Sequence, residues 1–364
     1  MNTVLPTVAA TLLSILLVAP TADPTPIHRS RDRMTVVVDR QDASATLLPS
    51  GRVLVVGGFC RCGGDSRVLD SAVLYDVRTG HWHPTGPLHT PRDGQTATLL
   101  PSGRVLVVGG HDAGLAALAS AELYDPTTGR WRPTGALHDA RAFATATLLR
   151  TGRVLVVGGQ DAGGASLASA ELYDPRAGAW TRTGTMRAPR VHHTATLLPM
   201  GAVLVAGGGT SDGAILTSAE LYDARSGRWT RTGTLHIARI GHTATLLPTG
   251  RVLVSGGGSR RAALASAELY DPVRGRWVRT GAMATARVGH MAVPLPDGQV
   301  LALGGAVSPS AEIYSPRTGT WTAARPPRTD CAGPGTLLPT GDVLLLDCAR
   351  FASGDGAIVY PRHT

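Results

Sequence analysis

The sequence predicts an all-β fold built from repeated units of four short antiparallel strands. Glycine and proline account for 45 and 25 of the 364 residues, which is too many for a helical protein and suits short strands joined by tight turns. Two phrases also recur at a period near 50 residues, which predicts one repeat array rather than two separate domains. A chain that is 43% hydrophobic and 17% charged has enough apolar residues for a large core, and this composition excludes a coiled coil, a disordered chain or a polytopic membrane protein.

The first phrase reads T-A-T-L-L-P-x-G-R-V-L-V-x-G-G. It occupies residues 44–58, 96–110, 145–159, 194–208 and 243–257, with a weaker copy at 291–305. The TATLL run predicts a first strand (strand A) and P-x-G predicts its turn. The apolar RVLV run predicts a second strand (strand B) that is buried on both faces. The glycine doublet ends this strand where another backbone comes close.

The second phrase reads S-A-E-L-Y-D-P-x-x-G-x-W. AELYD predicts strand C, P-x-x-G predicts the next turn, and strand D begins at the tryptophan. The phrase places all seven tyrosines and all six tryptophans of the chain in register, namely Tyr75, Tyr124, Tyr173, Tyr222, Tyr270, Tyr314 and Tyr360, and Trp82, Trp131, Trp180, Trp229, Trp277 and Trp321. We expect these rings to fill the space between neighbouring sheets.

A period near 50 with a glycine doublet, then tyrosine, then tryptophan resembles the kelch repeat. The resemblance covers roughly residues 34–360 and implies a seven-bladed kelch-type β-propeller with four-stranded antiparallel blades. Six repeats are complete, and the seventh supplies only strands A, B and C. We predict that the β-branched segment 34–39 is the missing outer strand, so that the N-terminal strand completes the last blade and closes the ring. Six blades with frayed ends is the alternative.

The strand order places the D–A and B–C connections on one face and the A–B and C–D turns on the other. The turns are uniform, whereas the connections vary, and variable loops on a rigid scaffold are where binding residues concentrate. The longest connection is residues 59–70.

An arginine occupies the same place in six D–A connections. These candidate ligand-binding residues are Arg40, Arg92, Arg141, Arg190, Arg239 and Arg287. If they line the central mouth, they form a ring suited to carboxylate, sulfate or phosphate. The alternative is that each arginine pairs with a strand C glutamate and fastens the blades together. The resemblance to kelch domains implies an arginine near this point in either case.

Histidine lies three residues beyond the arginine in three repeats, at His193, His242 and His290. We expect these residues to contribute to ligand binding at the mouth. Neighbouring histidines could instead bind a metal, or they could simply be hydrogen-bonded. We expect no metal and no cofactor.

Cys331 and Cys348 fall opposite each other in the hairpin expected around Pro339–Gly341. We predict a disulfide between them, and two buried thiols are the alternative. Cys60 and Cys62 lie in the longest connection. We interpret them as a structural or redox-labile pair rather than as metal ligands.

An apolar run at residues 7–18 is too short to span a bilayer and suits a secretory signal. We therefore expect a signal peptide at 1–22, a flexible spacer at 23–33 and the propeller at 34–364, with the protein secreted or held in the cell envelope or periplasm. Translation starting at Met34 is the alternative.

No catalytic motif of the hydrolase, zinc-protease or phosphate-loop type occurs in its required setting. We therefore expect a non-catalytic, monomeric scaffold that binds a protein or glycan. The net charge of +9 favours an anionic ligand, but the scarcity of aromatic residues in the mouth loops argues against a specific nucleic acid. The kelch resemblance leaves open a carbohydrate-active enzyme, either a sugar-acid isomerase or a galactose-oxidase-like copper oxidase. The positions of the tyrosines within the repeat disfavour copper.

Overall fold

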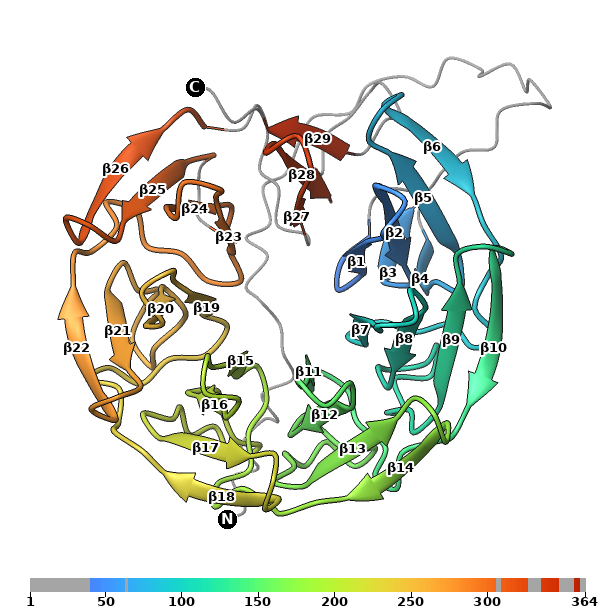
Figure 1. Ribbon diagram of the computed structural model, residues 1–364, viewed down its shortest axis with the longest axis horizontal. Coiled ribbons are helices and arrows are strands. Elements are labelled where there is room, and N and C mark those ends of the chain that lie inside the picture. Colours follow the sequence, from blue (N-terminus) through green and yellow to red (C-terminus); the bar gives the residue numbers. More distant parts are fainter. Residues whose placement is uncertain (1–39, 63–64, 306–308, 327–334, 347–356, 361–364) are drawn as a thin grey trace, which may run out of the picture. The chain divides into compact units, whose positions relative to one another are not determined.

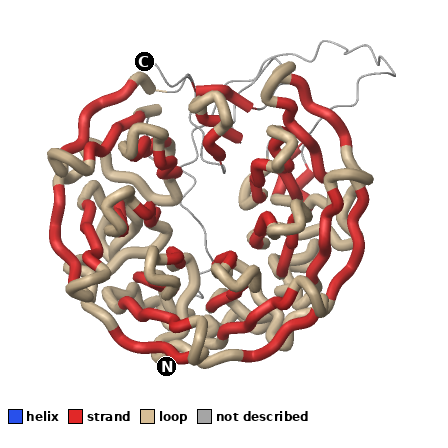
Figure 2. The backbone as a smooth tube through the Cα atoms, viewed as in Figure 1, coloured by secondary structure: helices blue, strands red, loops and turns tan. Residues whose placement is uncertain are grey.

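The computed structural model describes residues 40–62, 65–305, 309–326, 335–346 and 357–360. All of them belong to a compact unit that extends from Val36 to Thr364. The described residues of this unit are all-β and form seven small antiparallel sheets arranged in a ring, as the sequence predicts, with one further two-stranded sheet (Figures 1 and 2). No described segment forms a helix that could cross a membrane.

Six sheets have four strands in the order A, B, C, D, because each phrase of the sequence folds back on the previous one. Blade 1 contains β1 (Ser44–Leu47), β2 (Arg52–Val56), β5 (Ala72–Asp76) and β6 (His81–Pro84), and blade 2 contains β7 (Thr96–Leu99), β8 (Val105–Val108), β9 (Ala121–Asp125) and β10 (Arg130–Thr134). Blade 3 contains β11 (Thr145–Leu148), β12 (Val154–Val157), β13 (Ala170–Asp174) and β14 (Ala179–Arg182), and blade 4 contains β15 (Thr194–Leu197), β16 (Val203–Ala206), β17 (Ala219–Asp223) and β18 (Arg228–Arg231).

The remaining blades follow the same plan. Blade 5 contains β19 (Thr243–Leu246), β20 (Val252–Ser255), β21 (Ala267–Asp271) and β22 (Arg276–Thr280), and blade 6 contains β23 (Met291–Pro294), β24 (Val300–Leu303), β25 (Ala311–Ser315) and β26 (Thr320–Ala324). Blade 7 has three described strands, β27 (Gly335–Leu337), β28 (Val343–Leu346) and β29 (Ala357–Tyr360). The segment 34–39, predicted to be its fourth strand, lies outside the described residues. Strand β27 lies between β23 and β1, so the inner strands close the ring.

The core lies between the blades. Strand B is buried along its length in blades 2 to 6, as at Val105–Val108, and in blade 1 it is buried after the exposed Arg52. Each Tyr–Trp pair packs with ring centroids about 5 Å apart, as in Tyr124 and Trp131 at 5.0 Å. Both rings also bond to the preceding blade: the Tyr124 hydroxyl bonds to Thr85 Oγ1 at 2.7 Å, and Trp131 Nε1 donates to the Gly86 carbonyl at 2.7 Å. The repeated tyrosine and tryptophan side chains therefore join consecutive sheets.

One connection departs from the expected loop. Residues 59–70 contain a hairpin of β3 (Phe59–Cys62) and β4 (Asp65–Val68), a separate two-stranded sheet. Phe59 also bridges to Gln41. The extra residues of this connection form a ladder between two strands, whereas shorter connections form only isolated bridges, such as His111 to Ala117 and Gln160 to Ser166.

Candidate functional site

The D–A and B–C connections meet on one face of the ring, as the strand order predicts. Isolated bridges join the two kinds of connection in blades 2 to 5, for example Asp93 to His111 and Ile240 to Gly258. We call the inner end of these connections the mouth. The sequence predicts that the candidate arginines and histidines lie here.

The six predicted arginines lie inside the blades, with exposed fractions of 0–2%. Arg92 is representative: its guanidinium donates to the carbonyls of Gly109 and Ser120, to Ser120 Oγ and to Glu122 Oε1 at 2.8–3.2 Å. The same buried ion pair recurs at 2.9–3.1 Å in the next four blades, between Arg141 and Glu171, Arg190 and Glu220, Arg239 and Glu268, and Arg287 and Glu312. The structure thus contains the arginine–glutamate pairing that the sequence offered as the alternative.

The five arginines that pair with glutamate also connect two blades through their backbone. The Arg92 carbonyl accepts a hydrogen bond of 2.9 Å from Gly58 N, in the glycine doublet of blade 1, while its side chain binds blade 2. A side chain on the doublet would block this approach, because a Cβ built on Gly57 lies 2.4 Å from the Arg92 carbonyl oxygen. The glycine doublet of one blade and the arginine of the next blade therefore form one contact between the two blades.

Burial lowers the pKa of Arg92, Arg141, Arg190 and Arg239, and the paired glutamates partly offset this effect. Burial by itself would raise the pKa of Glu171, but its bonds to the His138 and Asp139 backbone, the His138 ring and Arg141 outweigh it and the pKa is lowered. The lowered pKa of Glu171 favours its charged form beside Arg141. An external anion would have to displace the glutamate to reach these guanidiniums.

Blade 1 lacks this glutamate, because Val73 occupies its place. Arg40 instead binds the Gly57 and Ser71 carbonyls and Ser71 Oγ at 2.7–3.2 Å. Burial lowers its pKa to about 10, an effect partly opposed by Asp70. Arg40 is 2% exposed, so it too lies inside its blade.

The three predicted histidines are buried between blades, at 5–6% exposure. Each Nε2 bonds to a strand A threonine of the preceding blade: His193 to Thr145 at 2.9 Å, and the other two at 3.0 Å to their equivalents, His242 to Thr194 and His290 to Thr243. Burial lowers the pKa of all three, to about 3 for His242 and His290, with nearby arginines adding to the effect. They are neutral, hydrogen-bonded contacts between blades. Within the described part of the chain, no three His, Cys, Asp or Glu side chains come together as a metal site.

The structure describes only some of the cysteines for which the sequence makes predictions. Cys331 and Cys348 lie outside the described residues. Cys60 lies on β3, is fully buried and is disulfide-bonded.

The sequence reasoning missed a second ring, which lies two residues beyond each arginine. All six residues there have φ between 52° and 63°, namely Asp42, Gly94, Phe143, His192, Gly241 and Gly289. Their peptides bond from blade to blade, as in Phe143 N to the Gly94 carbonyl at 2.9 Å and Gly289 N to the Gly241 carbonyl at 2.9 Å. Three of the six are not glycine, although this conformation costs other residues about 1 kcal/mol or more. That departure from the repeat was the signal available in the sequence.

The non-glycine members belong to a cluster that we call the polar sector, which consists of Asp42, Asp93, His111, Phe143 and His192. The Phe143 ring lies 5.1 Å from His111, edge to face, and 4.7 Å from His192. Asp93 Oδ1 lies 3.6 Å from His111 Nδ1, is buried and accepts no hydrogen bond from any residue that the structure describes. These contacts join blades 2, 3 and 4 along one side of the mouth.

The charges of the polar sector interact. The pKa of Asp42 is raised. Desolvation by the surrounding protein is the largest cause, Asp93 raises the pKa further, and His111 partly opposes the shift. Burial lowers the pKa of His192. Two carboxylates beside a row of three rings can accept hydrogen bonds from a ligand and pack against its apolar face.

The comparisons with known proteins agree with this architecture. Residues 43–257 match the model of the KLHDC2/KLHL20/DRC7 Kelch-repeats domain. A fungal alcohol oxidase of the AA5 family, solved with copper, is similar in structure with a TM-score of 0.70 and 19% identity over 89% of this chain and 74% of that one. The structure of YjhT is similar with a TM-score of 0.63 and 12% identity over 79% of this chain and 98% of that one. At these identities the likeness shows the fold alone. No curated protein matches.

Proposed function

Because the chain belongs to the kelch-repeat family, whose fold supports a binding scaffold in general, we propose that it is a non-catalytic scaffold and that its ligand contacts the polar sector of the mouth. One observation carries the proposal: Asp42, Phe143 and His192 hold a left-handed backbone where blades 2, 5 and 6 use glycine. Such strain concentrates at binding sites, because selection for stability alone would favour glycine there.

The chemistry of the polar sector favours a ligand that offers hydrogen-bond donors next to an apolar face. The buried Asp93 Oδ1 accepts no hydrogen bond in the described structure, and the rings of His111, Phe143 and His192 lie in contact. A glycan or a protein segment meets both requirements. The carboxylates do not favour an anion, so the anionic ligand expected from the arginine ring is not part of this proposal.

Export is the second element of the proposal. The disulfide at Cys60 supports an oxidising compartment, in keeping with the apolar run at residues 7–18. Mass spectrometry of the protein recovered from outside the cytoplasm should give a mature N-terminus at Asp23. A retained Met1 or a start at Met34 would contradict export through this segment.

The binding proposal is tested with defined glycan and peptide arrays. The triple variant Asp42→Gly, Phe143→Gly and His192→Gly gives these blades the residue that blades 2, 5 and 6 already use, so we expect it to fold. Ile240→Val, on the opposite side of the mouth, is the matched control. Wild type and control should bind the same array members, and the triple variant should bind them at least about tenfold more weakly, equivalent to about 1.4 kcal/mol. Undiminished binding by a folded triple variant would refute the proposal.

A further inference from the structure

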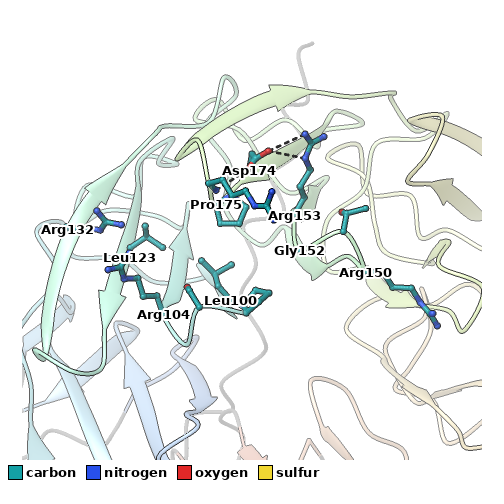
Figure 3. A pocket seen from close by; sticks show the side chains of 13 residues that line it. Leu100, Arg104, Leu123, Arg132, Arg150, Gly152, Arg153, Asp174 and Pro175 are labelled. Carbon is teal, nitrogen blue, oxygen red and sulfur yellow. Dashed lines mark hydrogen bonds and ion pairs between the residues drawn. The ribbon is translucent and has the colours of Figure 1, made fainter.

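A second concave site lies between blades 2 and 3, on the face of the A–B and C–D turns, opposite the mouth (Figure 3). Its volume is about 720 Å³, within the usual range of small-ligand sites. The lining residues are Leu100, Pro101, Ser102, Arg104, Leu123, Arg132, Arg150, Thr151, Gly152, Arg153, Asp174, Pro175 and Arg176. We call this site the arginine groove.

The arginine groove has a strong excess of positive charge. Five arginines and one aspartate line it. Arg153 pairs with Asp174 at 3.2 Å, and Arg104 pairs with Asp125 at 3.3 Å. Arg150 donates to the Pro199 carbonyl of blade 4 and points away from the other arginines (Figure 3).

The two remaining guanidiniums, those of Arg132 and Arg176, make no hydrogen bond or ion pair with any residue that the structure describes. They extend from opposite walls, since Arg132 is on β10 of blade 2 and Arg176 is in the C–D turn of blade 3. Both residues are exposed. Arginine binds tetrahedral and planar oxyanions through two parallel N–H groups, and an unpaired guanidinium is available for this without first giving up a partner.

Two of these arginines, Arg132 and Arg150, distinguish this gap from the gaps between the other blades, whereas the positions of Arg104, Arg153 and Arg176 are arginine in several blades. The residue after each tryptophan is His83, Arg132, Thr181, Thr230, Val278 or Thr322, so Arg132 is the one arginine. Arg150 likewise replaces the turn proline that the other six repeats have at Pro49, Pro101, Pro199, Pro248, Pro296 and Pro339. Two departures from the repeat thus line the same gap between blades: Arg132 adds an exposed guanidinium to the groove, whereas the guanidinium of Arg150 turns toward blade 4.

From this arrangement we propose that the arginine groove is a binding site for a ligand that carries phosphate or sulfate oxyanions. Arg132 and Arg176 bind the anionic groups from the two walls, and the ion-paired Arg104 and Arg153 raise the local positive potential. The side chains of Leu100 and Leu123, both nearly buried at 3–4%, form an apolar floor for the non-anionic part of the ligand. The site is independent of the mouth, because the two faces lie at opposite ends of strand A.

The test uses isothermal titration calorimetry of the full chain with two probes, pyrophosphate and a disulfated disaccharide, which separate phosphate from sulfate-ester sources. The variant Arg132→Thr with Arg176→Thr installs the residues that blades 3 and 2 have at the equivalent positions, Thr181 and Thr127. The control, Arg225→Thr with Arg228→Thr in blade 4, removes the same charge from a surface away from the groove. Neither pair of substitutions removes a side-chain hydrogen bond of the described structure.

We expect at least one probe to bind wild type and control with equal affinity, more weakly at high salt, and to bind the groove variant at least about tenfold more weakly. Saturable binding that is reduced equally in both variants would show a response to net charge alone and would overturn the proposal. Failure of both probes to bind at millimolar concentration would also overturn it. The mouth variants provide a separate check, because the triple glycine variant should bind these probes as wild type does.

Discussion

The two sides of the propeller mouth share one backbone and differ in their side chains. The polar sector has Asp42, Phe143 and His192 in the left-handed ring, with Asp93 and His111 beside them. The other side, which we call the glycine sector, consists of Gly209, Gly241, Gly258 and Gly289 with Ile240 and Val288. Backbone hydrogen bonds link ring residues in both sectors, as in Gly94 N to the Asp42 carbonyl at 3.1 Å and Gly289 N to the Gly241 carbonyl at 2.9 Å.

This difference separates what the fold requires from what a ligand requires. The glycine sector shows that the backbone path is satisfied by residues that have no functional group. The backbone ring can therefore form without the side chains of the polar sector, and three of these residues have a backbone conformation that is unfavourable for any residue but glycine. The arginine–glutamate pairs, by contrast, occur on both sides and belong to the common frame.

The largest expected effect is on that common frame. Arg92→Ala, in the polar sector, and Arg239→Ala, in the glycine sector, each leave a buried glutamate without its guanidinium. We expect each substitution to lower the free energy of unfolding by about 3–5 kcal/mol, measured by urea denaturation followed by tryptophan fluorescence. Equal losses would confirm that the arginines have the same structural role around the ring. Full stability combined with lost ligand binding in either variant would instead make the arginine a ligand-binding residue.

A smaller effect concerns pH and distinguishes blade 2 from blades 4 to 6. Burial holds the pKa of His242 and His290 at about 3, below the value near 6.5 expected in the unfolded chain. The unfolded state thus binds more protons between these values, so stability is full above about pH 6.5 and is lost as pH falls toward about 3. Each histidine should contribute a slope of up to about 1.4 kcal/mol per pH unit in this range.

His242→Gln tests this slope with a residue that the chain already uses. Gln95 has the same place in blade 2, where its amide donates to the Val56 carbonyl at 2.9 Å. Urea denaturation at a series of pH values should show a shallower acid loss for His242→Gln than for wild type. An unchanged slope would mean that His242 is not the group that titrates.

Most of the architecture could be predicted from the sequence, because the repeat occurs six times in full and a seventh time in part. The register of Tyr124 and Trp131, the buried strand B and the glycine doublet each have one physical explanation in a four-stranded blade, and the structure confirms the all-β seven-bladed prediction. The arginine posed a harder question, because its spacing fits both a ligand ring and a buried pair. Only the position of Glu122 across the sheet, 3.0 Å from Arg92, separates the two.

The polar sector was less predictable for a different reason. Its residues are far apart in the sequence, and a single Asp42 or Phe143 looks like ordinary loop variation. The clue is that the aligned position is glycine in blades 2, 5 and 6, which indicates a positive φ before any coordinates are known. The contact of Phe143 with His111 and His192 depends on the curvature of the ring, and the repeat pattern does not specify that curvature.

The smallest expected effect on stability concerns the backbone conformation at one position of the left-handed ring, Phe143. If the left-handed backbone at Phe143 (φ 52°) belongs to the fold, Phe143→Gly should be more stable than Phe143→Ala by about 1 kcal/mol, since both lose the ring but only glycine adopts this conformation freely. Gly241→Ala, in the glycine sector, should cost a similar amount. The order is the reverse of that expected for an ordinary loop residue with negative φ, where alanine is the more stable choice because it restricts the unfolded chain. Urea denaturation of the three variants decides between these orders, and an alanine at position 143 that is as stable as glycine would show that the strain at the polar sector is absent in solution.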